Sequence, residues 1–153
     1  MTLIFRISIV LISWFSIIFL PKSSFRKYLT VTLFSACVLL AETMMAIGYK
    51  WWKTQGGVKY TIFNALSFIF GPFFAVNMWI FHFTNGRFFL YTLINLVMDL
   101  IFAFPLNIFF QKVGAYKLKK FKSKHLFYTA FAYSFINYGF QKLVEKGDVN
   151  SQS

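Results

Sequence analysis

The stretch FFLYTLINLVMDLIFAFPLNIFFQ, residues 88–111, decides what kind of protein this chain forms. It holds 15 Leu, Ile, Phe or Val residues and one charged residue, Asp99. On the scale for inserting helices into a membrane, these apolar residues contribute about −5 to −9 kcal/mol, and the aspartate opposes them by about 3 kcal/mol. A helix of this length also crosses ~30 Å of hydrocarbon. We therefore expect a transmembrane helix that inserts in spite of its charge.

The composition extends this expectation to the whole chain. Its 153 residues are 58% hydrophobic and 23% aromatic, with 16 basic and 4 acidic residues. A soluble domain of this length leaves about 30% of its surface facing water, and so few charged residues cannot cover it. The aromatic and aliphatic content excludes disorder, and the single cysteine, Cys37, excludes a disulfide-stapled secreted domain. The remaining class is a small membrane protein with several spans.

The predicted fold class is all-α: an integral membrane helical bundle of about five transmembrane helices. Residues 1–142 form one transmembrane domain, and residues 143–153 form a short polar C-terminal tail. No small residues mark a cleavage site after the first apolar run, so that run is read as an uncleaved span rather than a signal peptide. The expected spans are about 2–20, 28–49, 62–83, 88–110 and 125–141.

The last of these segments allows two interpretations. Polar side chains recur at every fourth position, and the opposite side is rich in phenylalanine. The segment either spans with this stripe turned into the bundle, or it lies flat in the membrane interface, which leaves four spans plus an interfacial helix. Spanning is favoured, because lysines at both ends can reach the headgroups. The stripe consists of His125, Thr129, Tyr133, Asn137 and Gln141.

The basic residues indicate how the chain sits in the cell membrane. Lysine and arginine concentrate in cytoplasmic loops, and the loops after the second and fourth spans hold nine of them. This predicts a multi-pass protein with a cytoplasmic N-terminus. The loop after the fourth span anchors the topology, and the same charges suit anionic lipid headgroups. No nucleic acid is expected there, because the loop is short and lies at the bilayer. Its lysines are Lys112, Lys117, Lys119, Lys120, Lys122 and Lys124.

Polar residues inside the spans are the best functional indicators in such a chain. Thr92, Asn95 and Asp99 share one helix face, and the preceding span offers a second polar stripe. The functional interpretation is a polar site near the membrane centre that binds a proton, a cation or a polar ligand. The structural interpretation is that Asp99 holds the bundle together through hydrogen bonds. The second stripe includes Asn64, Ser67 and His82.

Two further features concern the helices themselves. Arg6 and Glu42 fall at compatible depths in the first two spans, which predicts a buried ion pair. Pro72, after Gly71, and Pro105 each remove a backbone hydrogen bond and are expected to kink the third and fourth spans. Kinked or discontinuous helices line the substrate sites of some transporters, although proline kinks are also tolerated without a function.

Patterns of known catalytic chemistry are missing from the sequence. It holds no glycine-rich phosphate loop, no G-x-S-x-G and no H-E-x-x-H, and His82 and His125 lack ligand spacing to another His or Cys. We therefore expect no enzyme, no metal and no cofactor. The first hypothesis is an accessory, sensory or structural subunit that binds lipid and other membrane proteins or a second copy. The alternative is a small transporter or channel component with its polar site around Asp99.

A set of short motifs across residues 60–140 adds a resemblance. They are Phe70-Gly71-Pro72-Phe73-Phe74, Trp79-Ile80-Phe81, Asn85-Gly86-Arg87-Phe88, Asn95-Leu96-Val97-Met98-Asp99-Leu100, Phe104-Pro105-Leu106 and Lys117-Leu118-Lys119-Lys120-Phe121. Their order resembles small uncharacterised multi-spanning membrane proteins of low-GC Gram-positive bacteria. The resemblance implies a bacterial cytoplasmic membrane location and carries no activity with it.

Overall fold

The computed structural model describes residues 3–152, and almost all of them are helical. Two π-helical turns, η1 (Ile69–Phe73) and η2 (Phe102–Leu106), each join two α-helices into one longer unit. The two strands have two residues each: β1 (Trp52–Lys53) and β2 (Lys117–Leu118). The α-helices are α1 (Leu3–Ile18), α2 (Lys22–Tyr49), α3 (Val58–Phe68), α4 (Phe74–Thr84), α5 (Phe88–Ile101), α6 (Asn107–Lys112) and α7 (Ser123–Gln152).

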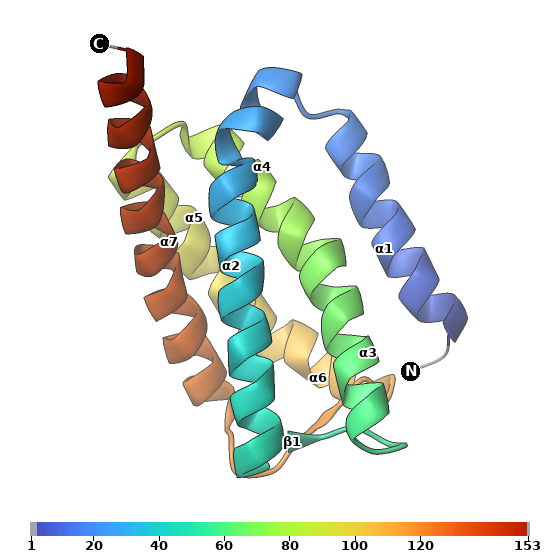
Figure 1. Cartoon of the computed structure of the whole chain (residues 1–153). Coiled ribbons are helices and arrows are strands. Elements are labelled where there is room, and N and C mark those ends of the chain that lie inside the picture. Colours follow the sequence, from blue (N-terminus) through green and yellow to red (C-terminus); the bar gives the residue numbers. More distant parts are fainter. Residues whose placement is uncertain (1–2, 153) are drawn as a thin grey trace.

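The helices form five units that run alternately up and down (Figure 1). These units are α1, α2, α3–η1–α4, α5–η2–α6 and α7. Helix α2 packs between α4 and α7, α5 packs on α7, and α1 packs against α3, η1 and α4. The beginning of α1, the α2–α3 connection and the α6–α7 connection lie at one end of the bundle, which we call the basic end (Figure 1). The predicted all-α class is confirmed.

Three of the units are long and apolar enough to cross a membrane: 22–49, 58–84 and 88–112. Helix α1 is apolar but has 16 residues, and α7 has 30 residues with a charged C-terminal part. Two boundaries differ from the expectation. Helix α2 begins at Lys22, directly after Pro21, so residues 22–27, which were expected to connect the first two spans, form the first part of a helix. Helix α7 continues to Gln152, so the expected polar tail is also helical.

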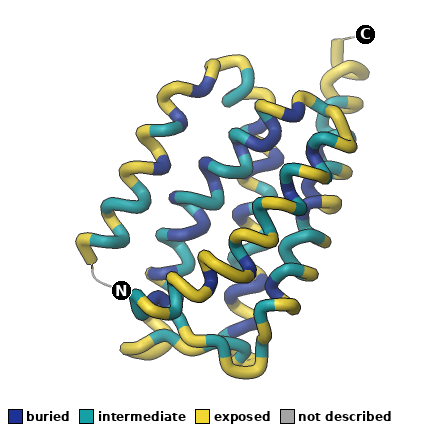
Figure 2. Tube along the Cα trace, turned by 180° about the vertical axis from the view of Figure 1, so that it is seen from behind, coloured by how far each residue is buried: buried dark blue, intermediate teal, exposed yellow. Residues whose placement is uncertain are grey.

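The outer surface of the bundle is rich in apolar side chains, and a number of polar side chains lie inside it. Large apolar side chains are exposed along every long helix, and Phe89 is 88% exposed. Exposed positions recur along α1 and around the outside of the bundle (Figure 2). Side chains with hydrogen-bonding groups are buried instead. They are Ser13, Thr32, Glu42, Thr43, Thr61, Asn64, Thr84, Asn95, Asn107, Ser134, Asn137 and Gln141.

An aromatic core closes the bundle at the end opposite the basic end. Tyr28 of α2 stacks on Phe81 of α4 with ring centroids 5.3 Å apart, and Phe81 contacts Tyr91 of α5 at 5.0 Å. Met78 and Val31 are fully buried in the same cluster. This contact between α2, α4 and α5 leaves space further along the bundle axis, toward the basic end.

Both proline positions coincide with the π-helical turns. Gly71 has φ −103° and ψ −107°, so the helical path breaks immediately before Pro72. Pro105 lies inside η2, where the wider turn accommodates the missing backbone donor. Gly71 also contacts α1 closely: a Cβ atom at this position would lie 3.3 Å from the Cα of Val10. The break therefore sets how close α1 comes to the rest of the bundle.

Candidate functional site

A partly open cavity lies around Asp99 and measures about 160 Å³. We call it the Asp99 cavity. Four helical units and both π-helical turns form its wall, and Pro72 borders it directly. Its polar lining residues come from α2, α4, α5 and α7: Ser35, Asn77, Asn95, Asp99, Tyr133, Ser134 and Asn137.

The three asparagine side chains of this wall each donate a hydrogen bond from Nδ2. Asn95 donates from Nδ2 to the backbone oxygen of Tyr91 over 2.9 Å. Asn137 donates from Nδ2 to Ser35 Oγ over 3.0 Å, and Asn77 donates from Nδ2 to a threonine hydroxyl on α2 over 3.3 Å. Within residues 3–152, Asp99 Oδ2 is buried without a hydrogen-bond partner. A buried acceptor of this kind attracts a group that brings a donor or a positive charge.

The second cavity measures about 120 Å³ and lies nearer the basic end; we call it the Glu42 cavity. Glu42 is 9% exposed, and no hydrogen bond or ion pair of its carboxylate is found in the described part of the chain. Asn64 borders the same cavity and donates from Nδ2 to the backbone oxygen of Ala115 over 2.7 Å. Its Oδ1 is buried without a partner among the described residues. This cavity therefore also combines a carboxylate with an unsatisfied acceptor.

The two cavities adjoin each other. Six residues line both of them, and Tyr133 of α7 is the polar one among these. The others are Leu39, Phe68, Phe73, Phe102 and Ala130. The Glu42 cavity therefore lies next to the Asp99 cavity, on the side toward the basic end.

The predicted ion pair between Arg6 and Glu42 is not formed. Arg6 lies with its Cζ 5.4 Å from the ring centre of Tyr60 on α3. Helix α1 packs against the outer side of α3, η1 and α4, whereas Glu42 faces the interior between α2, α3 and α7. The similar depth of Arg6 and Glu42 along their helices does not bring them into contact, because the α3–η1–α4 unit lies between the two side chains.

The structure divides the predicted polar site. Asn95 and Asp99 share the Asp99 cavity, and Asn64 belongs to the Glu42 cavity. Ser67 donates to the backbone oxygen of Phe63 over 2.8 Å, and it borders neither cavity. Thr92 also lies outside both linings, with its Oγ1 buried and unpartnered within the described residues. His82 is near the opposite end, where its Nδ1 lies 2.7 Å from Ser24 Oγ.

Sequence reasoning missed the contributions of α2 and α4 to the site. Ser35 and Asn77 stand alone among apolar neighbours, so no periodic signal identified them. The stripe on α7 did carry a signal: Thr129, Tyr133 and Asn137 line the cavities, and Gln141 is 3% exposed. Four of the five stripe residues therefore face the bundle, whereas His125 at the beginning of the stripe is exposed.

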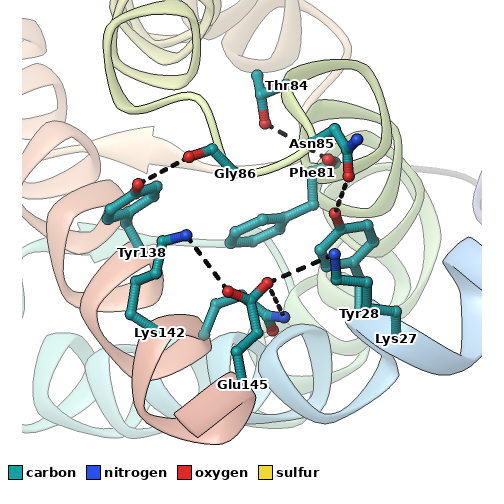
Figure 3. A network of polar contacts seen from close by, with 10 residues as sticks. Lys27, Tyr28, Phe81, Thr84, Asn85, Gly86, Tyr138, Lys142 and Glu145 are labelled. Atoms are coloured by element: carbon teal, nitrogen blue, oxygen red, sulfur yellow. Dashed lines mark hydrogen bonds and ion pairs between the residues drawn. The ribbon is translucent and has the colours of Figure 1, made fainter. Parts of the chain in front are cut away.

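A separate polar network joins three helical units at the end opposite the basic end (Figure 3). Glu145 of α7 accepts from Lys142 over 3.3 Å and lies 3.6 Å from Lys27 Nζ of α2. Burial alone would raise the pKa of Glu145, but hydrogen bonds from Gln141 and Lys142 lower that pKa below its ordinary value of 4.5. Beside it, Tyr138 donates to the backbone oxygen of Gly86 over 2.9 Å. This network attaches the end of α7 to α2 and to the α4–α5 turn.

The described residues contain no group of three or more His, Cys, Asp or Glu side chains placed to hold a metal ion. Comparison with known proteins gives no relative: no family model, no curated protein and no solved structure matches this chain.

Proposed function

We propose that this protein is a five-span protein of the bacterial cell membrane with its N-terminus in the cytoplasm. Three helical units long and apolar enough to cross a membrane support the placement, as does the exposed apolar surface of α1 and α7. The fold also gathers nine lysines at the basic end, whereas the opposite end mixes basic residues with Glu145 and Asp148. Because cytoplasmic loops are rich in lysine and arginine, the basic end is assigned to the cytoplasm.

Within this class, we propose a small transporter or channel component that handles protons or small cations. The observation that carries the proposal is Asp99: its Oδ2 lacks a partner, and its cavity is bordered by polar side chains of four helical units. A carboxylate is costly inside a membrane, and such residues commonly mark ion or proton pathways. Glu42 provides a second carboxylate in the adjoining cavity.

The helix breaks support this interpretation. Residues of both π-helical turns line the Asp99 cavity, including Pro72, Phe102 and Leu106. Irregular helical backbone is tolerated at membrane depth where it is buried or lines a cavity, and transporters place such breaks at their binding sites. The aromatic core around Tyr28 and Phe81 lies at the end opposite the basic end, so we place the entry of the proton or cation at the basic end.

The competing hypothesis is a non-enzymatic accessory, sensory or structural subunit in which Asp99 acts through stability alone. The two hypotheses predict different results for Asp99→Asn, which keeps the size of the side chain and removes its charge. If Asp99 serves transport, the Asp99→Asn variant should keep the fold and lose the flux. If Asp99 is purely structural, the same variant should be less stable at every pH, and the flux should not change.

The test uses purified protein in vesicles with a pH-sensitive dye inside, under an imposed membrane potential. We expect wild type to admit protons or methylammonium faster than empty vesicles, and Asp99→Asn to lower that rate at least tenfold while its thermal unfolding stays close to wild type. Asp148→Asn is the matched control, because Asp148 is exposed near the end of α7. Wild-type vesicles as tight as empty ones, together with a destabilised Asp99→Asn, would support the accessory subunit instead.

A further inference from the structure

A pair of lysines faces each other across the short β-ladder at the basic end. The strands are antiparallel, with Trp52 opposite Leu118 and Lys53 opposite Lys117. Both lysines are exposed. Directly opposed side chains on one face of a ladder lie about 5 Å apart at Cβ, and like charges in such a pair are destabilising. The fold therefore brings two positive charges together where it gains nothing from their mutual contact.

Among residues 3–152, no Asp or Glu side chain forms an ion pair with either lysine. The sequence has four acidic residues, of which Asp99, Glu145 and Asp148 lie in α5 and in the far part of α7. The fourth, Glu42, is buried inside α2 and faces its cavity. The basic end, by contrast, holds Lys50, Lys53, Lys59, Lys112, Lys117, Lys119, Lys120, Lys122 and Lys124. The counter-charge for the lysine pair must therefore come from outside the protein.

The strands of the ladder have only two residues each, and aromatic stacking beside them holds the ladder in place. The Trp51 ring stacks on Phe121 with centroids 4.8 Å apart, and on Tyr49 with centroids 5.9 Å apart. The backbone oxygen of Trp51 also accepts from the amides of Lys119 and Lys120, over 2.9 and 3.2 Å. Tryptophan and tyrosine concentrate at the level of the lipid headgroups. In the membrane placement proposed above, these aromatic rings place the two lysines at the level of the headgroup phosphates.

We propose that the β1–β2 ladder is a binding site for an anionic phospholipid, whose headgroup phosphate lies between Lys53 and Lys117. The site is formed by two connections that are distant in the sequence, because Lys53 follows α2 and Lys117 follows α6. A bound phosphate neutralises both lysines and ties the two connections together. This inference relies on the membrane placement proposed above and is independent of the cavities and of transport.

The test measures thermal unfolding of the whole protein in nanodiscs of phosphatidylcholine, with and without phosphatidylglycerol. We expect phosphatidylglycerol to raise the melting temperature of wild type. The double variant Lys53→Gln with Lys117→Gln should lose at least half of that increase. In phosphatidylcholine alone the same variant should melt at or above the wild-type temperature, because the repulsion between the lysines has been removed. A purely structural role of these lysines would lower stability in both lipids.

The matched control is Lys112→Gln with Lys124→Gln, which removes the same charge from exposed positions of the basic end outside the ladder. It should keep most of the lipid effect. An equal loss in both double variants would show only diffuse attraction and overturn the site. If inorganic phosphate in phosphatidylcholine discs raises the melting temperature as much as phosphatidylglycerol does, the ligand is a free phosphate and not a lipid. Release of the protein from native membranes by high salt or alkaline carbonate would instead contradict the membrane placement.

Discussion

The hydroxyl of Tyr91 on α5 donates a hydrogen bond to the backbone carbonyl of Ser134 on α7 over 2.8 Å. Tyr91 is 1% exposed, and Ser134 is 4% exposed. The bond joins two helices whose polar residues border the Asp99 cavity, and it sets how α7 is placed relative to Asn95. A polar contact of this kind also shows that α7 is an integral part of the bundle.

Removing this hydroxyl should destabilise the protein without leaving a large cavity. We expect Tyr91→Phe to lower the free energy of unfolding by about 1–2 kcal/mol, because a buried hydrogen bond is lost and its acceptor is left less well satisfied. Unfolding in mixed detergent or nanodiscs measures the change. Tyr128→Phe is the control, since Tyr128 is 66% exposed, and it should stay within about 0.5 kcal/mol of wild type. An unchanged Tyr91→Phe would mean that other contacts hold α7.

Asn107 should be a structural centre for the basic end. It is fully buried, donates to Ser123 Oγ over 3.0 Å, and accepts from Tyr116 over 2.9 Å and Gln111 over 3.3 Å. We expect Asn107→Leu to cost about 2–4 kcal/mol, because several buried polar groups lose their partner at once. Increased protease cleavage within residues 113–122 should accompany the loss.

A graded variant separates this effect from simple loss of packing. Tyr116→Phe removes one of the three bonds to Asn107 and should cost about 1 kcal/mol. The double variant should lose less unfolding free energy than the two single variants lose together, because both substitutions remove the same bond. Full additivity would show that Asn107 and Tyr116 act independently, contrary to the observed geometry.

The sequence predicted the helical class because long apolar runs leave few alternatives, and it predicted the inward stripe of α7 because four-residue spacing fixes one helix face. It did not predict which faces meet. Arg6 and Glu42 were paired by depth alone, and Asn64 was assigned to Asp99 by a shared polar character. Which of these residues meet depends on the lateral packing of α1 and α3 in the bundle, and hydropathy does not encode that packing. The β-ladder was missed because two-residue strands have no periodicity.

Two glycines should respond in opposite ways to the same substitution. A Cβ at Gly71 would lie 3.3 Å from the backbone Cα of Val10, so Gly71→Ala must push α1 outward. We expect a loss of about 1–2 kcal/mol, which is typical of overpacking. Gly48 is exposed on α2 with nothing within 4 Å of its Cβ position, so Gly48→Ala should add about 0.5–1 kcal/mol. Unfolding of both variants in one lipid mixture measures this, and a neutral Gly71→Ala would show that α1 is loosely held.

The network around Glu145 should make stability depend on pH in a defined direction. Hydrogen bonds and positive charge lower the pKa of Glu145 below 4.5 in the folded protein, against the opposing effect of burial. The unfolded chain therefore binds this proton more readily than the folded one. The contribution of Glu145 is fully present above about pH 4.5 and is lost as the pH falls through the folded pKa.

The substitution Glu145→Gln should therefore lower stability at neutral pH and not at strongly acidic pH. We expect a loss of up to about 1 kcal/mol at pH 7, because Lys27 and Lys142 are partly exposed and their ion pairs are screened by water and salt. Thermal unfolding of wild type and variant across pH should give curves that converge below pH 4. Asp148→Asn, at an exposed position one turn further on, should give no such convergence. A constant difference at every pH would show that Glu145 stabilises α7 through packing and not through its charge.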